Sequence, residues 1–106
     1  MTLTFRQSNS ETELIGWVHE AIDAPAAGIV INPAAFSFTS MALMDALKMF
    51  PGPIVEVHIS NIFKREPIYH HSYVSLVATG VIAGLGAEGY VLAVKAVIDR
   101  PGSNQS

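Results

Sequence analysis

Short, uniformly apolar runs alternate along this chain with longer segments whose apolar residues recur at helical spacing. Gly28-Ile29-Val30-Ile31 is the clearest such run, and a strand of this kind is typical of a parallel sheet covered by helices on both faces. Strands are expected at 3–7, 28–31, 54–59 and 79–83, and helices at 11–24, from the caps at 39–40 through 50, and at 88–98. This alternation predicts a three-layer α/β domain whose site lies at the carboxyl ends of parallel strands.

Two local signals support the helix boundaries. Ser10 followed by Glu13 has the spacing of a capping box, in which each residue satisfies a free backbone N–H group of the first turn. Pro25 ends the helix that begins there. The hydroxyls of Thr39 and Ser40 can cap the next helix in the same way.

Composition narrows the class of protein. The chain has 106 residues, 50% of them hydrophobic and 14% charged, which fits one small α/β domain over 1–100 with a polar tail at 101–106. No apolar stretch reaches the roughly 20 residues of a bilayer span, and no signal-peptide pattern opens the sequence, so we expect a cytoplasmic protein. Zero cysteines exclude disulfides, and a net charge of −3 without a basic stripe argues against nucleic acid as a partner. Because half of the residues of so short a chain are hydrophobic, we expect it to self-associate.

Glu56 and His58 are the strongest candidates for chemistry. They are two positions apart on a predicted strand, so both side chains project from the same face, with His58 near the carboxyl end. A carboxylate beside an imidazole fixes its tautomer and favours its protonated form, which suits a proton donor. The alternative is a structural pair at a strand end or a subunit contact. Asn32 and Ser60 follow predicted strands and can contact a ligand, or they can simply stabilise turns.

The loop at 60–71 carries much of the chain's charge. Lys64, Arg65, His70 and His71 lie on it, and such a segment can close over an acidic small molecule, or it can be a plain solvated loop. Two adjacent histidines without a third ligand at suitable spacing make a poor metal site. We therefore expect no metal.

Gly84, Gly86 and Gly89 spell GxGxxG after a strand, which superficially matches a dinucleotide fingerprint. The motif follows the last predicted strand, however, and no further strand places an acidic residue for a ribose. Tight turning and close packing of helix on sheet explain the glycines without a ligand, so no nucleotide cofactor is expected.

Four segments carry a resemblance to a known family. They are Arg6-Gln7-Ser8-Asn9-Ser10, Asn32-Pro33-Ala34-Ala35 with Thr39-Ser40, Glu56-Val57-His58-Ile59-Ser60-Asn61, and Arg65 through His71-Ser72-Tyr73. In order and spacing they resemble the type II 3-dehydroquinate dehydratases over essentially the whole chain. The resemblance implies a flavodoxin-like fold, trimers gathered into dodecamers, and dehydration of 3-dehydroquinate without metal or nucleotide.

The resemblance also assigns roles to individual residues. It implies that His58 is the general acid, Glu56 its orienting carboxylate, and Asn32 a substrate contact. It further implies that Ile59 and Ser60 clamp the substrate carboxylate, that Asp45 reaches the site of a neighbouring subunit, and that Arg65 belongs to a lid.

This sequence departs from the family pattern in three ways. The family's first strand, its base tyrosine with the activating arginine, and its first helix are expected before Leu3. Phe38 and Tyr69 stand where the family has a substrate-binding histidine and arginine. Three functions remain open: a dehydratase lacking its N-terminal segment, a relative with a changed acidic ligand, or a non-catalytic binding or assembly domain.

Overall fold

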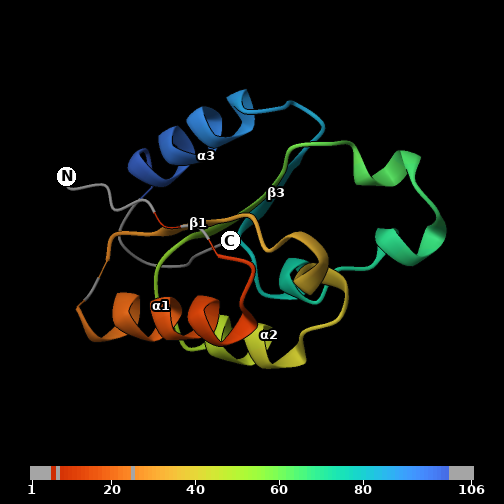
Figure 1. Cartoon of the computed structure of the whole chain (residues 1–106). Coiled ribbons are helices and arrows are strands. Elements are labelled where there is room, and N and C mark those ends of the chain that lie inside the picture. The colour runs from red at the N-terminus through yellow and green to blue at the C-terminus, as the bar shows by residue number, and fades with distance from the viewer. Residues whose placement is uncertain (1–5, 7, 25, 101–106) are drawn as a thin grey trace.

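A computed structural model describes residues 6, 8–24 and 26–100, and a parallel sheet lies at its centre. The strands β1 (Ile29–Ile31), β2 (Ile54–His58) and β3 (Gly80–Ala83) are arranged in the order β1-β2-β3. The helices α1 (Glu11–Asp23) and α2 (Met41–Lys48) cover one face, and α3 (Glu88–Ile98) covers the other (Figure 1). The predicted three-layer parallel α/β architecture is confirmed. The strand expected at 3–7 lies mostly outside the described residues, as does the tail at 101–106.

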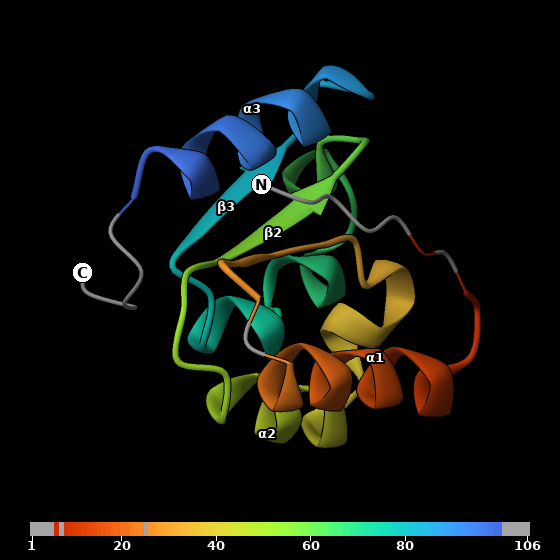
Figure 2. The ribbon, with the colours of Figure 1, turned by 90° about the vertical axis from the view of Figure 1, so that its left-hand side faces the viewer.

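The two faces of the sheet have separate apolar cores. Ile31 and Ile54 pack with Leu43 and Leu47 against α1 and α2, whereas Val57 belongs to the cluster beneath α3. The view in Figure 2 shows the sheet between these helical layers. Because side chains alternate along β2, the face that holds Ile54 also holds Glu56 and His58. The alternation of side chains along β2 therefore directs Glu56 and His58 toward the face of the sheet that α2 covers.

The helix caps follow the sequence signals with one variation. The Ser10 side chain accepts a hydrogen bond from the Glu13 backbone N–H at 3.3 Å. In a capping box the Glu13 side chain would accept from the Ser10 backbone N–H. Here the Ser8 hydroxyl accepts from that N–H at 2.9 Å and donates to the Glu13 carboxylate at 2.6 Å. Ser40 caps α2 by accepting from the Leu43 N–H at 2.9 Å.

The glycine motif has the structural explanation that we predicted. Gly84 and Gly86 have φ angles of +85° and +60° and turn the chain from β3 toward α3. A Cβ atom on Gly89 would lie only 3.2 Å from Val57 and 3.3 Å from Ile82. This glycine therefore permits the close approach of α3 to the sheet.

The loop expected at 60–71 and two other segments between the predicted elements contain short 3-10 helices. These are η1 (Ala34–Phe38), η2 (Ile62–Lys64), η3 (Pro67–His70) and η4 (Val74–Leu76). Val74 of η4 is fully buried and packs against the core beneath α2. Elements of three to five residues are too short to show a hydrophobic period. None of the helices in the described part of the chain has the length and hydropathy needed to cross a membrane.

Candidate active site

A cleft of about 430 Å³ opens at the carboxyl ends of β1 and β2. It brings together most of the side chains that the sequence singled out, and it is lined by Asn32, Ala34, Ala35, Phe38, His58, Ile59, Ser60, Ile62, Arg65 and Tyr69. Glu56 lies beneath this lining and is fully buried. Asp45 is the exception, because it lies on the exposed side of α2 and is not part of the cleft lining.

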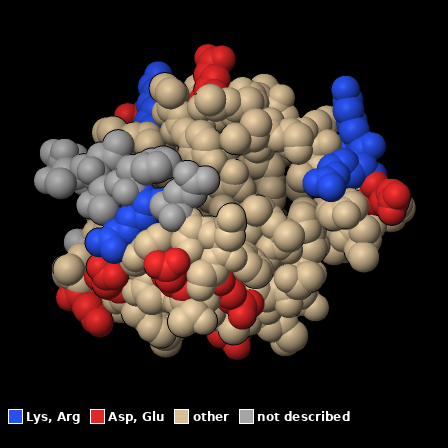
Figure 3. All heavy atoms as spheres, viewed as in Figure 1, with Lys and Arg blue, Asp and Glu red and all other residues tan. Residues whose placement is uncertain are grey.

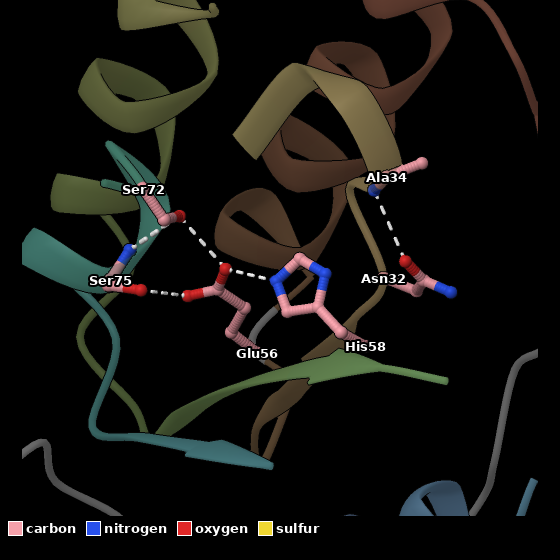
Figure 4. Close-up of polar contacts among 6 residues, drawn as sticks. All are labelled: Asn32, Ala34, Glu56, His58, Ser72 and Ser75. Carbon is pink, nitrogen blue, oxygen red and sulfur yellow. Dashed lines mark hydrogen bonds and ion pairs between the residues drawn. The ribbon is translucent and has the colours of Figure 1, made fainter. Parts of the chain in front are cut away.

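Glu56 and His58 form a close, buried pair. The Nε2 atom of His58 lies 2.5 Å from Oε2 of Glu56, and the two side chains are 5% and 0% exposed. The Ser72 hydroxyl donates to the same Oε2 at 2.8 Å, and the Ser75 hydroxyl donates to Oε1 at 2.5 Å (Figure 4). Both oxygens of the carboxylate are therefore hydrogen-bonded.

These contacts favour the ionised form of the Glu56 carboxyl group. Burial by itself raises the pKa of Glu56, but hydrogen bonds from His58, Ser75 and Ser72 outweigh burial and hold the pKa below its usual 4.5. An ionised Glu56 can only accept, so the Nε2 atom of His58 carries a proton. The second ring nitrogen, Nδ1, is then the one available to a ligand, and Figure 4 shows it on the side of Asn32 and Ala34.

Ser72 has a fixed hydroxyl direction. Its oxygen accepts a hydrogen bond from the Ser75 backbone N–H at 3.2 Å, which leaves the hydroxyl proton to donate to Glu56. The sequence alone assigned neither serine a catalytic or binding role, because each lies more than a dozen positions from Glu56, beyond the loop expected at 60–71 and outside every predicted element. The spacing of two hydroxyl residues three apart is the one local signal that indicates such a turn.

Asn32 is held from two directions. Its Oδ1 atom accepts from the Ala34 N–H at 3.1 Å and supports Ala34 at a φ of +51°. Its Nδ2 group donates to the Tyr90 hydroxyl at 2.8 Å. Asn32 thus bridges a turn and also lines the cleft. The contact with Tyr90 of α3 spans the edge of the sheet, and nothing in the local sequence indicates it.

The remaining wall of the cleft is a chain of ring contacts. Phe38 stacks on His58 with ring centroids 6.0 Å apart, and Tyr69 meets Phe38 edge-on at 5.3 Å. The guanidinium of Arg65 lies 4.0 Å from the centre of the Tyr69 ring. Figure 3 shows basic side chains gathered over the segment of η2 and η3, next to an acidic one. Of the histidines in the expected lid, His70 donates to the Arg65 carbonyl oxygen at 2.9 Å, and His71 is exposed.

A parallel sheet with helices on both faces places the chain in the α/β class, and in this class a cleft at the carboxyl ends of the strands is where ligands commonly bind. The model of the family "dehydroquinase class II" matches residues 1–98, and the chain belongs to this family. This finding confirms the resemblance drawn from the four sequence segments.

Curated relatives and solved structures agree with this assignment. The chain is 61% identical over 97 residues to 3-dehydroquinate dehydratase 2 of Agrobacterium fabrum, covering 92% of this chain and 65% of that protein. It is 55% identical over 106 residues to 3-dehydroquinate dehydratase of Streptomyces coelicolor, covering 99% of this chain and 67% of that protein. A type II dehydroquinase structure from Propionibacterium acnes superposes with a TM-score of 0.85 at 48% identity, covering 90% of this chain and 69% of that one. The chain thus spans about two thirds of the length of these relatives.

Proposed function

We propose that the cleft binds a small ring carboxylate and that His58 donates a proton to the leaving hydroxyl in the dehydration of a 3-dehydroquinate-like acid. The observation that supports this most directly is the buried Glu56–His58 pair, whose outer ring nitrogen is free for a ligand. A general acid must lie within hydrogen-bond reach of the group that it protonates. His58 lines the cleft, so a ligand bound there can come within hydrogen-bond reach of its ring.

The other residues receive roles under the same proposal. Glu56 orients His58, and Asn32 contacts the substrate. The Ile59 backbone and the Ser60 hydroxyl bind the carboxylate, and Arg65 brings a positive charge to the rim of the cleft. The exposed Asp45 reaches the site of a neighbouring copy in a homo-oligomer, a trimer or dodecamer as in the family. We further propose a cytoplasmic location.

Proton abstraction needs a second group. The base of the family is a tyrosine beside an arginine, and the resemblance matches neither to a residue of this sequence. We therefore expect the 106-residue chain to retain the acid half of the reaction and to dehydrate 3-dehydroquinate slowly. General acid–base groups each contribute about 10²–10⁴-fold to a rate, which is the size of the expected deficit.

The assay follows the absorbance of the conjugated enone product formed by the chain, by His58→Ala and by Phe63→Ala. Phe63 is an exposed ring outside the cleft lining. We expect weak turnover that His58→Ala lowers further by about 10²-fold or more and that Phe63→Ala leaves unchanged. Turnover that is insensitive to His58→Ala would contradict the assigned acid.

A second candidate function is binding of a different small acid without dehydration. The observation that favours it is the contact between Phe38 and Tyr69, the two positions that depart from the family pattern. The spectrum of such a binding domain changes when the acid binds, but no enone product forms. The two candidates are thus separated by pairing the turnover assay with a binding measurement.

A further inference from the structure

Tyr69 is held in the cleft wall by contacts of both its ring and its backbone. The Phe38 ring meets it edge-on, with the centroids 5.3 Å apart and the planes at 86°. The guanidinium of Arg65 lies 4.0 Å from the centre of the Tyr69 ring, which is within the range of a cation–π contact. The Tyr69 backbone N–H donates to the Glu66 carbonyl oxygen at 2.9 Å, at the start of η3. The ring is therefore positioned without the help of a ligand.

The hydroxyl of this tyrosine is available to a ligand. Tyr69 is half-buried and lines the cleft, and its hydroxyl forms no hydrogen bond with the other described residues. The Tyr90 hydroxyl, in contrast, accepts from Asn32 at 2.8 Å. A phenol hydroxyl can donate one hydrogen bond and accept another while it stays neutral. An alcohol group of a ligand can do the same, so the two groups are complementary in both directions.

The other polar groups of the cleft match a ligand with both a carboxylate and hydroxyls. Asn32 uses one N–H of its Nδ2 group on Tyr90 and one lone pair of Oδ1 on Ala34, which leaves a second N–H and a second lone pair. Ser60 is an exposed hydroxyl residue of the lining. Of the described residues that line the cleft, Arg65 is the one with a permanent positive charge. Its contact with the ring face leaves its N–H groups able to bind a carboxylate.

We infer that Tyr69 is a specificity-determining residue whose hydroxyl binds a ring hydroxyl of the ligand, and that Arg65 and Phe38 position it; the inference rests on the proposed ligand site and specifies which side chain recognises the hydroxyl. A ligand that lacks this hydroxyl displaces water from Tyr69 without replacing its hydrogen bond, which is unfavourable. The cleft therefore favours a hydroxylated ring carboxylate over its deoxy counterpart, which agrees with the 3-dehydroquinate-like acid proposed above.

The test compares quinate, a hydroxylated ring carboxylate, with the analogues of quinate that each lack a single secondary hydroxyl. Dissociation constants are measured by NMR from the shifts of the His58 ring signals. We expect one of these analogues to bind the unmodified chain about 3–10-fold more weakly than quinate does, which is the loss expected for one neutral hydrogen bond. Tyr69→Phe should weaken the binding of quinate by a similar factor and should leave the binding of that analogue unchanged.

Matched variants separate the hydroxyl from the residues that position it. Tyr73→Phe removes a tyrosine hydroxyl outside the cleft lining and should change none of the dissociation constants. Arg65→Lys keeps the positive charge but loses the planar guanidinium that contacts the Tyr69 ring, so it should reduce the discrimination between quinate and the analogue. When Tyr69→Phe is already present, Arg65→Lys should affect the two acids equally, because the contact that distinguishes them is gone.

The outcomes separate the inference from the proposed function. If Tyr69→Phe leaves the binding of quinate unchanged, or weakens quinate and every analogue by the same factor, the inference is overturned and the proposed ligand site stands. An equal effect of Tyr73→Phe also overturns it. If none of these acids shifts the His58 signals of the unmodified chain, the ligand site itself is refuted and the inference fails with it.

Discussion

At the scale of single residues, Ser72 and Ser75 determine how the buried Glu56 carboxylate is held. Each donates to one of its oxygens, and a hydrogen bond to a charged group contributes about 1.5–3 kcal/mol. We expect Ser75→Ala to raise the pKa of Glu56 and to lower the free energy of unfolding by about that amount. Ser75→Thr keeps the hydroxyl and should restore both properties.

The readout is the carboxyl stretching band of Glu56 followed with pH, together with urea unfolding. Ser40→Ala is a suitable control because Ser40 is buried and caps α2 without touching Glu56. It should lower stability and leave the titration of Glu56 unchanged. An identical titration in Ser75→Ala and in the parent chain would contradict the prediction.

The lowered pKa of Glu56 also predicts how stability depends on pH. The folded-state pKa lies below the usual 4.5, so the unfolded chain binds the proton more tightly than the folded chain does. Its contribution to stability is therefore complete above 4.5 and is lost as the pH falls through the lowered folded value. Of the described ionisable groups, His58 is the one whose charge acts on Glu56. Urea unfolding as a function of pH should show this loss, and Glu56→Gln should abolish that part of the pH dependence.

At the scale of elements, local patterns were sufficient for the helices and strands but not for the contacts between them. The caps at Ser10 and Ser40 and the apolar runs placed the main boundaries to within one or two residues. The alternation of side chains along a strand also predicted that Glu56 and His58 lie together, since residues two apart share a face. These signals are readable because each depends on neighbours within a few positions.

The rest of the site depends on contacts between distant segments. Ser75 reaches Glu56 across 19 positions, and Tyr90 reaches Asn32 across 58. The aromatic wall likewise joins η1 to η3. Such pairs are determined by how layers pack and not by any period along the chain, so a single sequence gives no sign of them.

Gly84 and Gly86 give a matched test of the turn between β3 and α3. Both have positive φ, but a Cβ atom on Gly84 would meet Cβ of Asn61 at 3.0 Å, whereas one on Gly86 would meet nothing within 4 Å. An alanine in this conformation costs about 1–2 kcal/mol in either case. We expect Gly84→Ala to cost more, because it also displaces Asn61, whose side chain caps η2. Equal melting temperatures for the two variants would contradict this.

At the scale of the whole molecule, apolar side chains remain uncovered on several surfaces. Leu76 and Ile68 are 75% and 69% exposed and line a second hollow of about 500 Å³ beside Phe38. On the outer side of α3, Val91 and Ile98 are 68% and 53% exposed. Contiguous apolar surface of this kind is typical of interaction sites.

We therefore expect the chain to self-associate at micromolar concentration, because covering apolar surface contributes roughly 25 cal/mol for each Å² removed from water. Leu76 and Ile68 are the two most exposed of the large apolar side chains in the described residues and line one hollow, so we expect the contact to form there. Ile68→Lys with Leu76→Lys should shift the mass measured by sedimentation toward the monomer. Val91→Lys with Ile98→Lys adds the same charge elsewhere and should shift it less. A monomeric parent chain would refute self-association, and a larger effect of the α3 pair would place the contact on the outer side of α3.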